Sequence, residues 1–340
     1  MKSILLTFDY ELFFGKSGTL KKCILEPTDK LLSVFSDKNI RSTFFIDILY
    51  YLRLKDNKAT YNESLLVKEQ IIKIVGQGHR VELHLHPHWL DAKYDNGEWL
   101  FPDYRYYKLS ALSEEKILEL FVTGTKALEE IAKEALPDYK VLAFRAGGFC
   151  IQPFQKIKNA FVKTGIKVDS SVVVGKKLES ELQSFDFMDA PELEYYKFNA
   201  NPLLQESNGL FYEIPIASYN RTYINRLSRK IARRFNKDNY RQYGDGVGSG
   251  FNEKRDLLKE ILPYRAQFSL ENESPEILLT KVVQSTKNII TFVSHPKLLS
   301  NVSFESIDKL ADQKISFLNI EDLIKNIETS NKPVSNTENR

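Results

Sequence analysis

The chain has 340 residues, a formal net charge of +3, 27% charged residues and 42% hydrophobic residues. These values are ordinary for a globular protein, and so small a net charge does not by itself indicate a nucleic-acid partner. Two cysteines do not suggest a disulfide-stapled secreted fold, and without a signal peptide or an apolar run of about 20 residues we expect a cytoplasmic protein.

Apolar, strand-like runs alternate with amphipathic, helix-like stretches along most of the chain. We predict strands at 3–8, 42–46, 80–85, 141–144, 167–169, 288–293 and 315–318. We predict helices at 27–35, 65–75, 113–135, 153–163, 303–310 and 321–327. Ser113 is expected to open the third helix and Gly165 to stop the fourth. Repeated strand-then-helix order predicts an α/β fold with a parallel sheet covered by helices, either an open doubly wound sheet or a closed barrel.

The segment from about residue 175 to 285 breaks this alternation. It contains one good strand at 210–215, a basic stretch at 221–241 and a Gly-rich run at 244–250. We interpret the segment as an insertion in a single domain that spans residues 1–330. Residues 331–340 are polar and are expected to form a disordered tail.

Polar side chains follow the predicted strands at the ends where parallel sheets bind ligands. In chain order they are Asp9, Asp47, His84, Arg145, Asp169 and His295. Residues expected to contact the substrate are Asp47, Asp169, Gly147, Gly148 and Trp89. The glycines let backbone approach a ligand closely, or only make a tight turn.

Four of the five histidines lie within ten residues, from His79 to His88, and the fifth is His295. His84 and His88 are four apart, so a helical turn or an extended segment places both on one side, where both can reach one cation. The alternative is a polar loop whose histidines bond only to backbone or water. His86 is predicted to be a supporting or packing residue.

A carboxylate should complete this set, because two histidines alone bind a divalent metal poorly. Asp9 and Glu11 are two apart at a strand end, so they point to the same side while Tyr10 points away. Such a pair is costly on a buried strand unless a cation or a function holds it; the alternative is a pair of solvated turn residues. Arg145 can hold a carboxylate by a bidentate bond, and His295 suits general acid chemistry.

In order and content these motifs resemble those of the polysaccharide deacetylases of carbohydrate esterase family 4, which have the NodB-homology fold. The corresponding segments are TFDYE (TFDDG in the family), STFFI, GHRVELHLHPHW (GHEIGNHTxxHP), LSEEKILELFVTGTKALEEI, FRAGGF (RPPYG), GIKVDSS and VSHP. The likeness covers residues 1–175 and 285–328, about two thirds of the chain.

This resemblance implies a distorted (β/α) barrel of about seven parallel strands that binds one divalent metal ion, with zinc the expected metal. It places His84 and His88 on the two metal histidines of the family. It also implies that Asp9 is the base that activates a water, that Arg145 orients this base, and that His295 is the acid. The expected activity is removal of an N- or O-linked acetyl group from a polysaccharide or an activated sugar precursor.

One position departs from the family, because Tyr10 stands where the metal-binding aspartate is expected. A phenol is mostly protonated at neutral pH and is a poor substitute. Either Glu11 becomes the metal ligand while Asp9 stays the base, or these two acids exchange roles; we favour the first. Two other functions stay open: hydrolysis of a C–N bond in a small non-sugar amide, and glycan binding by a barrel that has lost catalysis.

Eight basic residues and one acid, Asp238, lie between Arg221 and Arg241. The apolar residues among them recur at helical spacing: Ile224, Leu227, Ile231 and Phe235. This pattern predicts a basic amphipathic helix, which either packs on the barrel or contacts anionic membrane lipid or the pyrophosphate of an activated sugar.

Overall fold

The computed structural model describes residues 2–180, 182–248, 264–271 and 273–330. Within these ranges a central sheet of nine strands has the order β11-β12-β8-β7-β4-β3-β1-β16, and β17 pairs with β1. The strands are β1 (Lys2–Tyr10), β3 (Thr43–Asp47), β4 (Arg80–Leu85), β7 (Ala143–Ala146), β8 (Val168–Asp169), β11 (Tyr196–Phe198), β12 (Phe211–Glu213), β16 (Ile289–Ser294) and β17 (Ile315–Leu318). Only the pair of β11 and β12 is antiparallel among the pairings described in this sheet.

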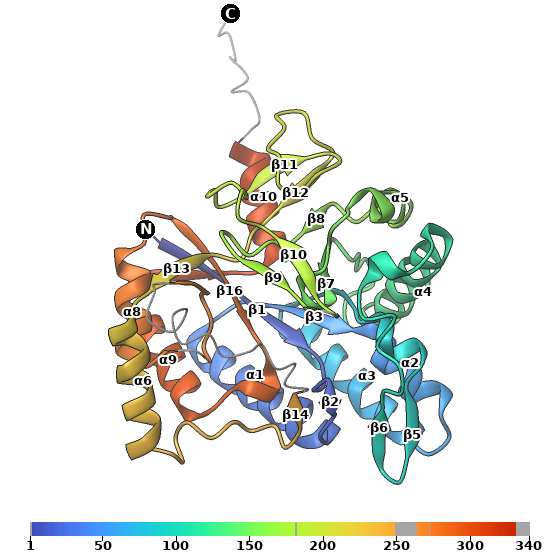
Figure 1. Ribbon diagram of the computed structural model, residues 1–340, viewed down its shortest axis with the longest axis horizontal. Helices are drawn as coiled ribbons and strands as arrows, with labels where there is room; N and C mark the ends of the chain where they lie inside the picture. Colours follow the sequence, from blue (N-terminus) through green and yellow to red (C-terminus); the bar gives the residue numbers. More distant parts are fainter. Residues whose placement is uncertain (1, 181, 249–263, 272, 331–340) are drawn as a thin grey trace, which may run out of the picture.

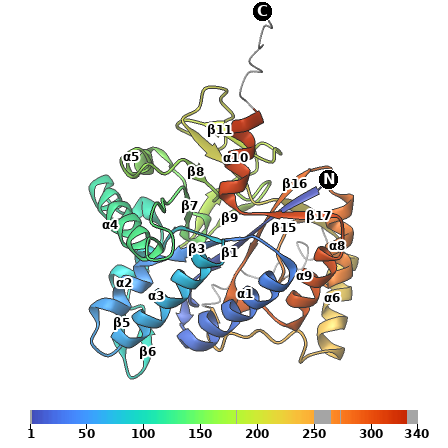
Figure 2. The same ribbon diagram turned by 180° about the vertical axis from the view of Figure 1, so that it is seen from behind.

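Helices surround this curled sheet, as Figures 1 and 2 show from opposite sides. They are α1 (Glu26–Lys38), α2 (Ile48–Asp56), α3 (Tyr61–Gly76), α4 (Glu114–Ala132), α5 (Gln155–Thr164), α6 (Tyr223–Phe235), α8 (Pro275–Gln284), α9 (Asn301–Ala311) and α10 (Ile320–Ser330). β1 is buried from Ile4 to Tyr10, because a parallel strand beneath helices is covered on both faces. Among the described helices, none combines the length and the apolar character needed to cross a membrane.

Backbone hydrogen bonds join the two ends of the sheet. The amide of Ala217, just beyond β12, donates to the carbonyl of Thr291 in β16 at 3.0 Å. Phe268 lies beside this junction, since its amide donates to Ala217 at 2.9 Å and its carbonyl accepts from Val293 at 3.0 Å. The predicted α/β fold with a curled, barrel-like parallel sheet is therefore confirmed.

The parallel part of the sheet has eight strands in the described ranges, not about seven. The additional one is β12, which lies inside the segment 175–285 predicted as an insertion. That segment also supplies β11 and the short strands β9 (Lys177–Glu179), β10 (Ser184–Asp186), β13 (Ser218–Arg221), β14 (Val247–Gly248) and β15 (Tyr264–Gln267). The predicted tail at 331–340 and the last two residues of the Gly-rich run lie outside the described residues.

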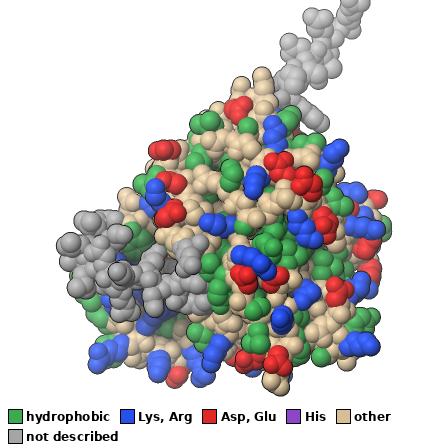
Figure 3. Space-filling model, turned by 45° about the vertical axis from the view of Figure 1, so that its right-hand side comes forward, with side chains coloured by type: hydrophobic (Ala, Val, Ile, Leu, Met, Phe, Trp, Pro, Cys, Tyr) green, Lys and Arg blue, Asp and Glu red, His purple; other side chains and the backbone are tan. Residues whose placement is uncertain are grey.

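Three further short strands lie outside the central sheet: β2 (Gly15–Lys16) pairs with β14, and β5 (Lys93–Asp95) forms a hairpin with β6 (Glu98–Leu100). The surface in Figure 3 carries acidic and basic side chains interspersed with hydrophobic ones. This mixture agrees with the small net charge of the chain.

Candidate active site

The carboxyl end of β1 carries an acid that is fixed by a buried arginine. Oδ1 of Asp9 accepts a hydrogen bond from Nη1 of Arg145, in β7, at 2.6 Å. The same guanidinium donates to Thr7 Oγ1 at 2.8 Å and, through Nε, to the carbonyl of Ser170 at 2.7 Å. Arg145 is completely buried, so this charge-assisted network holds the Asp9 carboxylate in one orientation.

Tyr10 lies on the opposite side of β1. Its hydroxyl donates to Oε1 of Gln70, in α3, at 2.9 Å, and the side chain is buried. Period-two alternation predicted this orientation. The residue that departs from the family motif therefore points away from the other strand-end residues, and Glu11 faces the histidines in its place.

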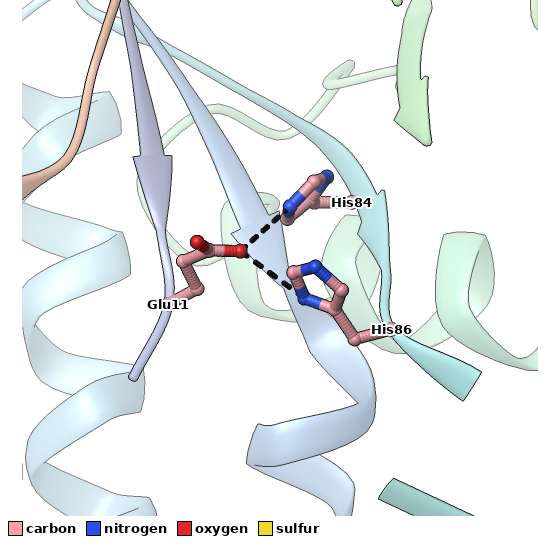
Figure 4. Close-up of side chains that lie close together, drawn as sticks. All are labelled: Glu11, His84 and His86. Atoms are coloured by element: carbon pink, nitrogen blue, oxygen red, sulfur yellow. Dashed lines mark hydrogen bonds and ion pairs between the residues drawn. The ribbon is translucent and has the colours of Figure 1, made fainter. Parts of the chain in front are cut away.

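Glu11, His84 and His86 form a group whose ligand atoms all lie within 4.8 Å of one another (Figure 4). Oε2 of Glu11 is 3.0 Å from His84 Nε2 and 3.1 Å from His86 Nδ1. His84 lies in β4 and His86 directly follows it, so period-two alternation puts both on one face. A tetrahedral zinc site with bonds of about 2.0–2.1 Å puts its donors about 3.4 Å apart. One carboxylate and two imidazoles at these separations fit a divalent cation.

Neighbouring groups select which atoms of this trio face one another. His84 Nδ1 lies 2.7 Å from the carbonyl of Arg145, which can accept its proton and leave Nε2 toward Glu11. Lys297 donates from Nζ to Oε1 of Glu11 at 2.8 Å and to the carbonyl of Leu12 at 2.6 Å. With Oε1 occupied by the lysine, Oε2 is the oxygen that Glu11 presents to the histidines.

The pKa values reflect this crowding of charge. Burial opposes the charged form of His84, but its hydrogen bond to Glu11 and the nearby carboxylates outweigh burial and raise its pKa to about 9. Burial also opposes ionisation of Glu11, yet Lys297 and the histidines lower its pKa well below the usual range. Burial lowers the pKa of His86 to about 3. Without a cation, an ionised Glu11 therefore lies between a protonated His84 and a neutral His86, and His84 must release its proton before it can bind a metal ion.

Asp47, at the end of β3, contacts the imidazole of His86 from within the packed interior. Its Oδ2 lies 3.3 Å from His86 Nδ1 and accepts from Trp89 Nε1 at 2.6 Å. Burial raises the pKa of Asp47 to about 7. Trp89 is itself buried, with its ring centroid 4.8 Å from that of Tyr50. Both residues were expected to contact substrate, and the structure places both in the packing behind the histidines.

His88, predicted as the second histidine ligand, does not join the trio. It lies in a 3-10 turn (Pro87–Leu90), where the regular alternation of β4 has ended. Its ring centroid is 4.6 Å from that of Phe14 and 4.9 Å from that of Phe101. Its Nδ1 has no hydrogen-bond partner in the described part of the chain. His86, predicted as a supporting residue, lies in the candidate metal-binding trio instead, because residues two apart share the face of a strand.

His295 follows β16 and approaches the two acids. Glu271 accepts hydrogen bonds from its backbone amide and from Nδ1, the latter at 3.1 Å. Nε2 then lies 3.7 Å from Asp9 Oδ2 and 3.7 Å from Glu11 Oε1. Burial opposes protonation, but Glu271 and the two site acids outweigh it and raise the pKa of His295. This arrangement presents one imidazole N–H to the site.

The glycines after β7 make room for the histidines and for an aromatic ring. A Cβ on Gly147 would lie 2.8 Å from His86 Nε2 and 2.7 Å from the carbonyl of Leu85. Gly148 has φ of 58°, and a Cβ there would lie 2.7 Å from the hydroxyl of Tyr107. These two positions were expected to contact substrate, and in the structure they pack against site residues.

A cavity of about 600 Å³ has Tyr107 in its lining. The ring centroid of Tyr107 is 6.4 Å from that of His86, so one residue of the lining lies near the histidine group. The remaining lining residues are Pro102, Asp103, Tyr104, Arg105, Lys108 and Leu182. Aromatic and polar groups around one hollow are typical of small-molecule and glycan sites.

Asp169, also expected to contact substrate, is completely buried at the end of β8. Its Oδ1 accepts from Ser171 Oγ at 2.6 Å. Burial and the charge of Asp169 raise the pKa of Glu213, in β12, well above the usual range. The two buried carboxyl groups form a pair beside the strand ends rather than a surface that a ligand could reach.

Three residues of this region were not predicted from the sequence to belong to the site. Glu213 and Lys297 each left a signal: an acid inside the apolar strand at 210–215, and a lysine two residues after the strand-end histidine. Glu271 left none, because it lies 24 residues before its partner His295 in the segment interpreted as an insertion.

No family model matches the chain, and no curated protein sequence matches it. Among solved structures, the likeness identifies the fold as that of the polysaccharide deacetylases, the class that the sequence motifs predicted. A candidate polysaccharide deacetylase from Mycobacterium smegmatis is similar with a TM-score of 0.50 and 14% sequence identity, over 97% of this chain and 91% of that chain.

Other solved structures are similar at lower scores. A family 4 carbohydrate esterase from Streptomyces lividans has a TM-score of 0.41 and 11% identity, over 93% of this chain and 91% of that chain. The polysaccharide deacetylase Bc1974 from Bacillus cereus has a TM-score of 0.40 and 11% identity, over 94% and 92% of the two chains. At 14% identity, the likeness to the Mycobacterium smegmatis structure shows the fold alone and does not show the chemistry of the site residues.

Proposed function

We propose that this protein is a metal-dependent hydrolase that removes an acetyl group from a carbohydrate. The observation that carries the proposal is the meeting of three groups at the carboxyl ends of parallel strands: Asp9 with Arg145, Glu11 with His84 and His86, and His295 with Glu271. The first supplies a base, the second a cation site and the third an acid. A structure with a similar fold, from Mycobacterium smegmatis, is named a candidate polysaccharide deacetylase.

Glu11, His84 and His86 would hold the cation, with zinc the first candidate because carboxylate and imidazole are ligands that zinc accepts. A bound divalent cation supplies Lewis-acid chemistry here, polarising the acetyl carbonyl and lowering the pKa of a water. Lys297 keeps one oxygen of Glu11 occupied and the other free.

The protein's own groups move the protons. Asp9 accepts a proton from the attacking water, held for this by Arg145, as the water oxygen bonds to the acetyl carbon. His295 donates its Nε2 proton to the leaving nitrogen or oxygen as the bond from that atom to the acetyl carbon breaks. The products are acetate and a free amine or alcohol. Glu271 fixes the tautomer of His295 and stabilises its charged form.

The cavity beside Tyr107 is the proposed place for the sugar. Tyr104 and Tyr107 offer ring faces, and Asp103 and Arg105 offer hydrogen-bonding groups at its border. A sugar ring is amphipathic, so a hollow with both kinds of group suits it.

Acetate release tests the proposal. Zinc-loaded protein is incubated with N-acetylated chito-oligosaccharides, O-acetylated xylan and small non-sugar amides. We expect release from an acetylated sugar, lost with chelator and reduced by about 10²–10⁴ in Asp9→Asn. Asp138→Asn, at an exposed acid, is the matched control and should behave as wild type.

Cleavage of the small amides alone would replace the carbohydrate substrate with a C–N hydrolase activity. A folded, metal-loaded protein that releases no acetate from any substrate would reject catalysis and favour glycan binding.

A further inference from the structure

α6 is turned with its apolar side away from the protein. Four apolar residues lie along one side at helical spacing: Ile224, Leu227, Ile231 and Phe235. Their exposed fractions are 76%, 43%, 48% and 84%, respectively. No side chain of this helix is buried. A surface helix ordinarily packs its apolar stripe on the core, so this orientation is the reverse of the usual one.

Arginines hold the helix in this orientation. Nη2 of Arg229 donates to the carbonyl of Glu271 at 3.3 Å, and the guanidinium of Arg226 lies 5.1 Å from the ring centroid of Tyr264. Just before α6, Arg221 forms a buried ion pair with Glu273 at 2.6 Å. The polar side of the helix therefore makes the contacts with the protein, and its apolar side is left to solvent.

The charges of α6 have a single sign. Residues 223–235 contain five basic side chains and no acid. Lys230 and Arg234 are four apart, so they form a row along one flank of the apolar stripe, and Lys237 follows the end of the helix. α6 lies at the outer edge of the molecule, near α8 and α9, in both Figure 1 and Figure 2. It is thus placed where a large flat partner can reach it.

We propose that α6 docks the protein on the surface of an anionic lipid bilayer. The apolar stripe enters the boundary between headgroups and acyl chains, and the flanking basic side chains contact lipid phosphates. A helix of 13 residues is about 20 Å long, enough to lie in the plane of the headgroups.

The charge pattern favours lipid over another protein copy. A second α6 packed against the stripe would bring the like charges that flank the stripe on both helices, such as Arg234, close together. Like charges in contact destabilise such an interface. Anionic lipid supplies both an apolar layer and negative charge, which complement the apolar stripe and the positive charge of α6. Lipid binding by α6 does not depend on the proposed catalysis.

Vesicle co-sedimentation of the full chain tests the docking. The vesicles are phosphatidylcholine alone, or phosphatidylcholine mixed with phosphatidylglycerol. We expect binding to the anionic vesicles only, weakened by salt. Ile224→Ser with Phe235→Ser should reduce binding about tenfold or more, because two large apolar side chains no longer enter the bilayer.

Two matched variants complete the experiment. Val162→Ser with Leu204→Ser removes apolar residues that are 56% and 58% exposed elsewhere on the surface, and should bind as wild type. Arg234→Ser with Lys237→Ser should weaken binding to anionic vesicles. Circular dichroism and thermal unfolding verify that each variant is folded.

Failure of the wild-type protein to bind either kind of vesicle would overturn the docking. Binding of the Ile224→Ser, Phe235→Ser variant to anionic vesicles as strongly as wild type would overturn it as well. Light scattering measures the oligomeric state of wild type and of this variant. A wild-type dimer that becomes a monomer in that variant would mean that a second copy covers the stripe, which also overturns lipid docking.

Discussion

Lys297 and Glu11 form a largely buried ion pair, with 2.8 Å between Nζ and Oε1. The lysine occupies one oxygen of the carboxylate while the histidines face the other. This pair supplies a positive charge next to the proposed metal ligand. Glu11 therefore has a partner whether or not a cation is bound.

Replacing Lys297 with methionine should show how strongly the buried carboxylate of Glu11 depends on a positively charged partner. We expect the free energy of unfolding of metal-free Lys297→Met to fall by about 3 kcal/mol, because Glu11 becomes a buried charge without its ammonium partner. Zinc should restore most of the loss, since a cation takes over that role. Urea unfolding with chelator and with zinc measures both effects, and Lys314→Met, at an exposed lysine, is the control. Equal stability of variant and wild type in chelator would contradict the expectation.

The identity of the second histidine ligand is tested by a pair of alanine variants. His86→Ala should lose the bound ion, because His86 Nδ1 lies 3.1 Å from the Glu11 oxygen that faces His84. His88→Ala should keep it, because that ring packs among Phe14 and Phe101. Elemental analysis and zinc titration calorimetry give the comparison. The opposite result would restore His88 as the ligand that its spacing from His84 suggested.

Much of the fold was predictable because the buried strands and the helix caps carry local signals. The apolar run from Ile4 onward predicts a covered parallel strand, and the structure has β1 there. Ser113 opens α4 by accepting from the amide of Lys116, and Gly165 ends α5 with φ of 76°, both at the predicted positions. α2 and α8 were not predicted, since α2 follows β3 without a break and α8 lies in the segment that lacks alternation.

The candidate site was predictable only as far as its residues lie on regular strands. Asp9, Tyr10 and Glu11 follow the alternation of β1, so their orientations could be derived from the sequence. His88 could not be placed, because a 3-10 turn interrupts β4 and changes which residues share a face. Glu271 could not be found either, because tertiary packing alone brings it to His295.

The close packing of backbone on His86 predicts a severe effect of a single methyl group. Gly147→Ala should lose metal and reduce the free energy of unfolding by about 1–3 kcal/mol, because its Cβ would lie 2.8 Å from His86 Nε2. Gly76→Ala is the matched control, since no atom lies within 4 Å of its Cβ position at the end of α3. That change should be neutral or stabilise by up to about 1 kcal/mol. Thermal unfolding and zinc binding of both variants check this, and a metal-binding Gly147→Ala protein would speak against the packing described.

We expect the free energy of unfolding to fall in mild acid, because the buried side chain of His79 binds a proton more readily in the unfolded chain. Its Nδ1 lies 3.0 Å from Ser42 Oγ, and burial lowers its pKa to about 4. In the unfolded chain the pKa is about 6.5, so between these values the unfolded state binds the proton more readily. The stabilising contribution is therefore complete above about pH 6.5 and is lost as pH falls toward 4, by about 3 kcal/mol.

Urea unfolding at several pH values measures this slope. His79→Gln keeps a polar group beside Ser42 but has no proton to bind, so its stability should fall less steeply between pH 6.5 and 4 than that of wild type. The difference between the two slopes isolates His79 from other buried histidines. Parallel slopes would mean that His79 binds its proton equally readily in the folded and unfolded states, which contradicts a lowered pKa in the fold.

The last prediction separates proton donation by His295 from metal binding. Nε2 lies 3.7 Å from both Asp9 and Glu11, and Glu271 holds Nδ1, so His295 can reach a leaving group without binding the ion. His295→Ala should keep its metal while the rate on an N-acetyl amide falls by about 10²–10⁴. The loss should be much smaller on an aryl acetate, because a phenolate departs with little protonation.

Glu271→Gln provides an intermediate case for the same comparison. The amide still hydrogen-bonds to the imidazole but lacks the charge that favours its protonated form, so the pH above which amide hydrolysis declines should move down. An equal loss on amide and aryl ester in His295→Ala would assign His295 to substrate orientation or to oxyanion stabilisation instead. Loss of the metal in that variant would place His295 among the ligands, and the 3.7 Å separations would then describe a coordination shell rather than an acid facing its substrate.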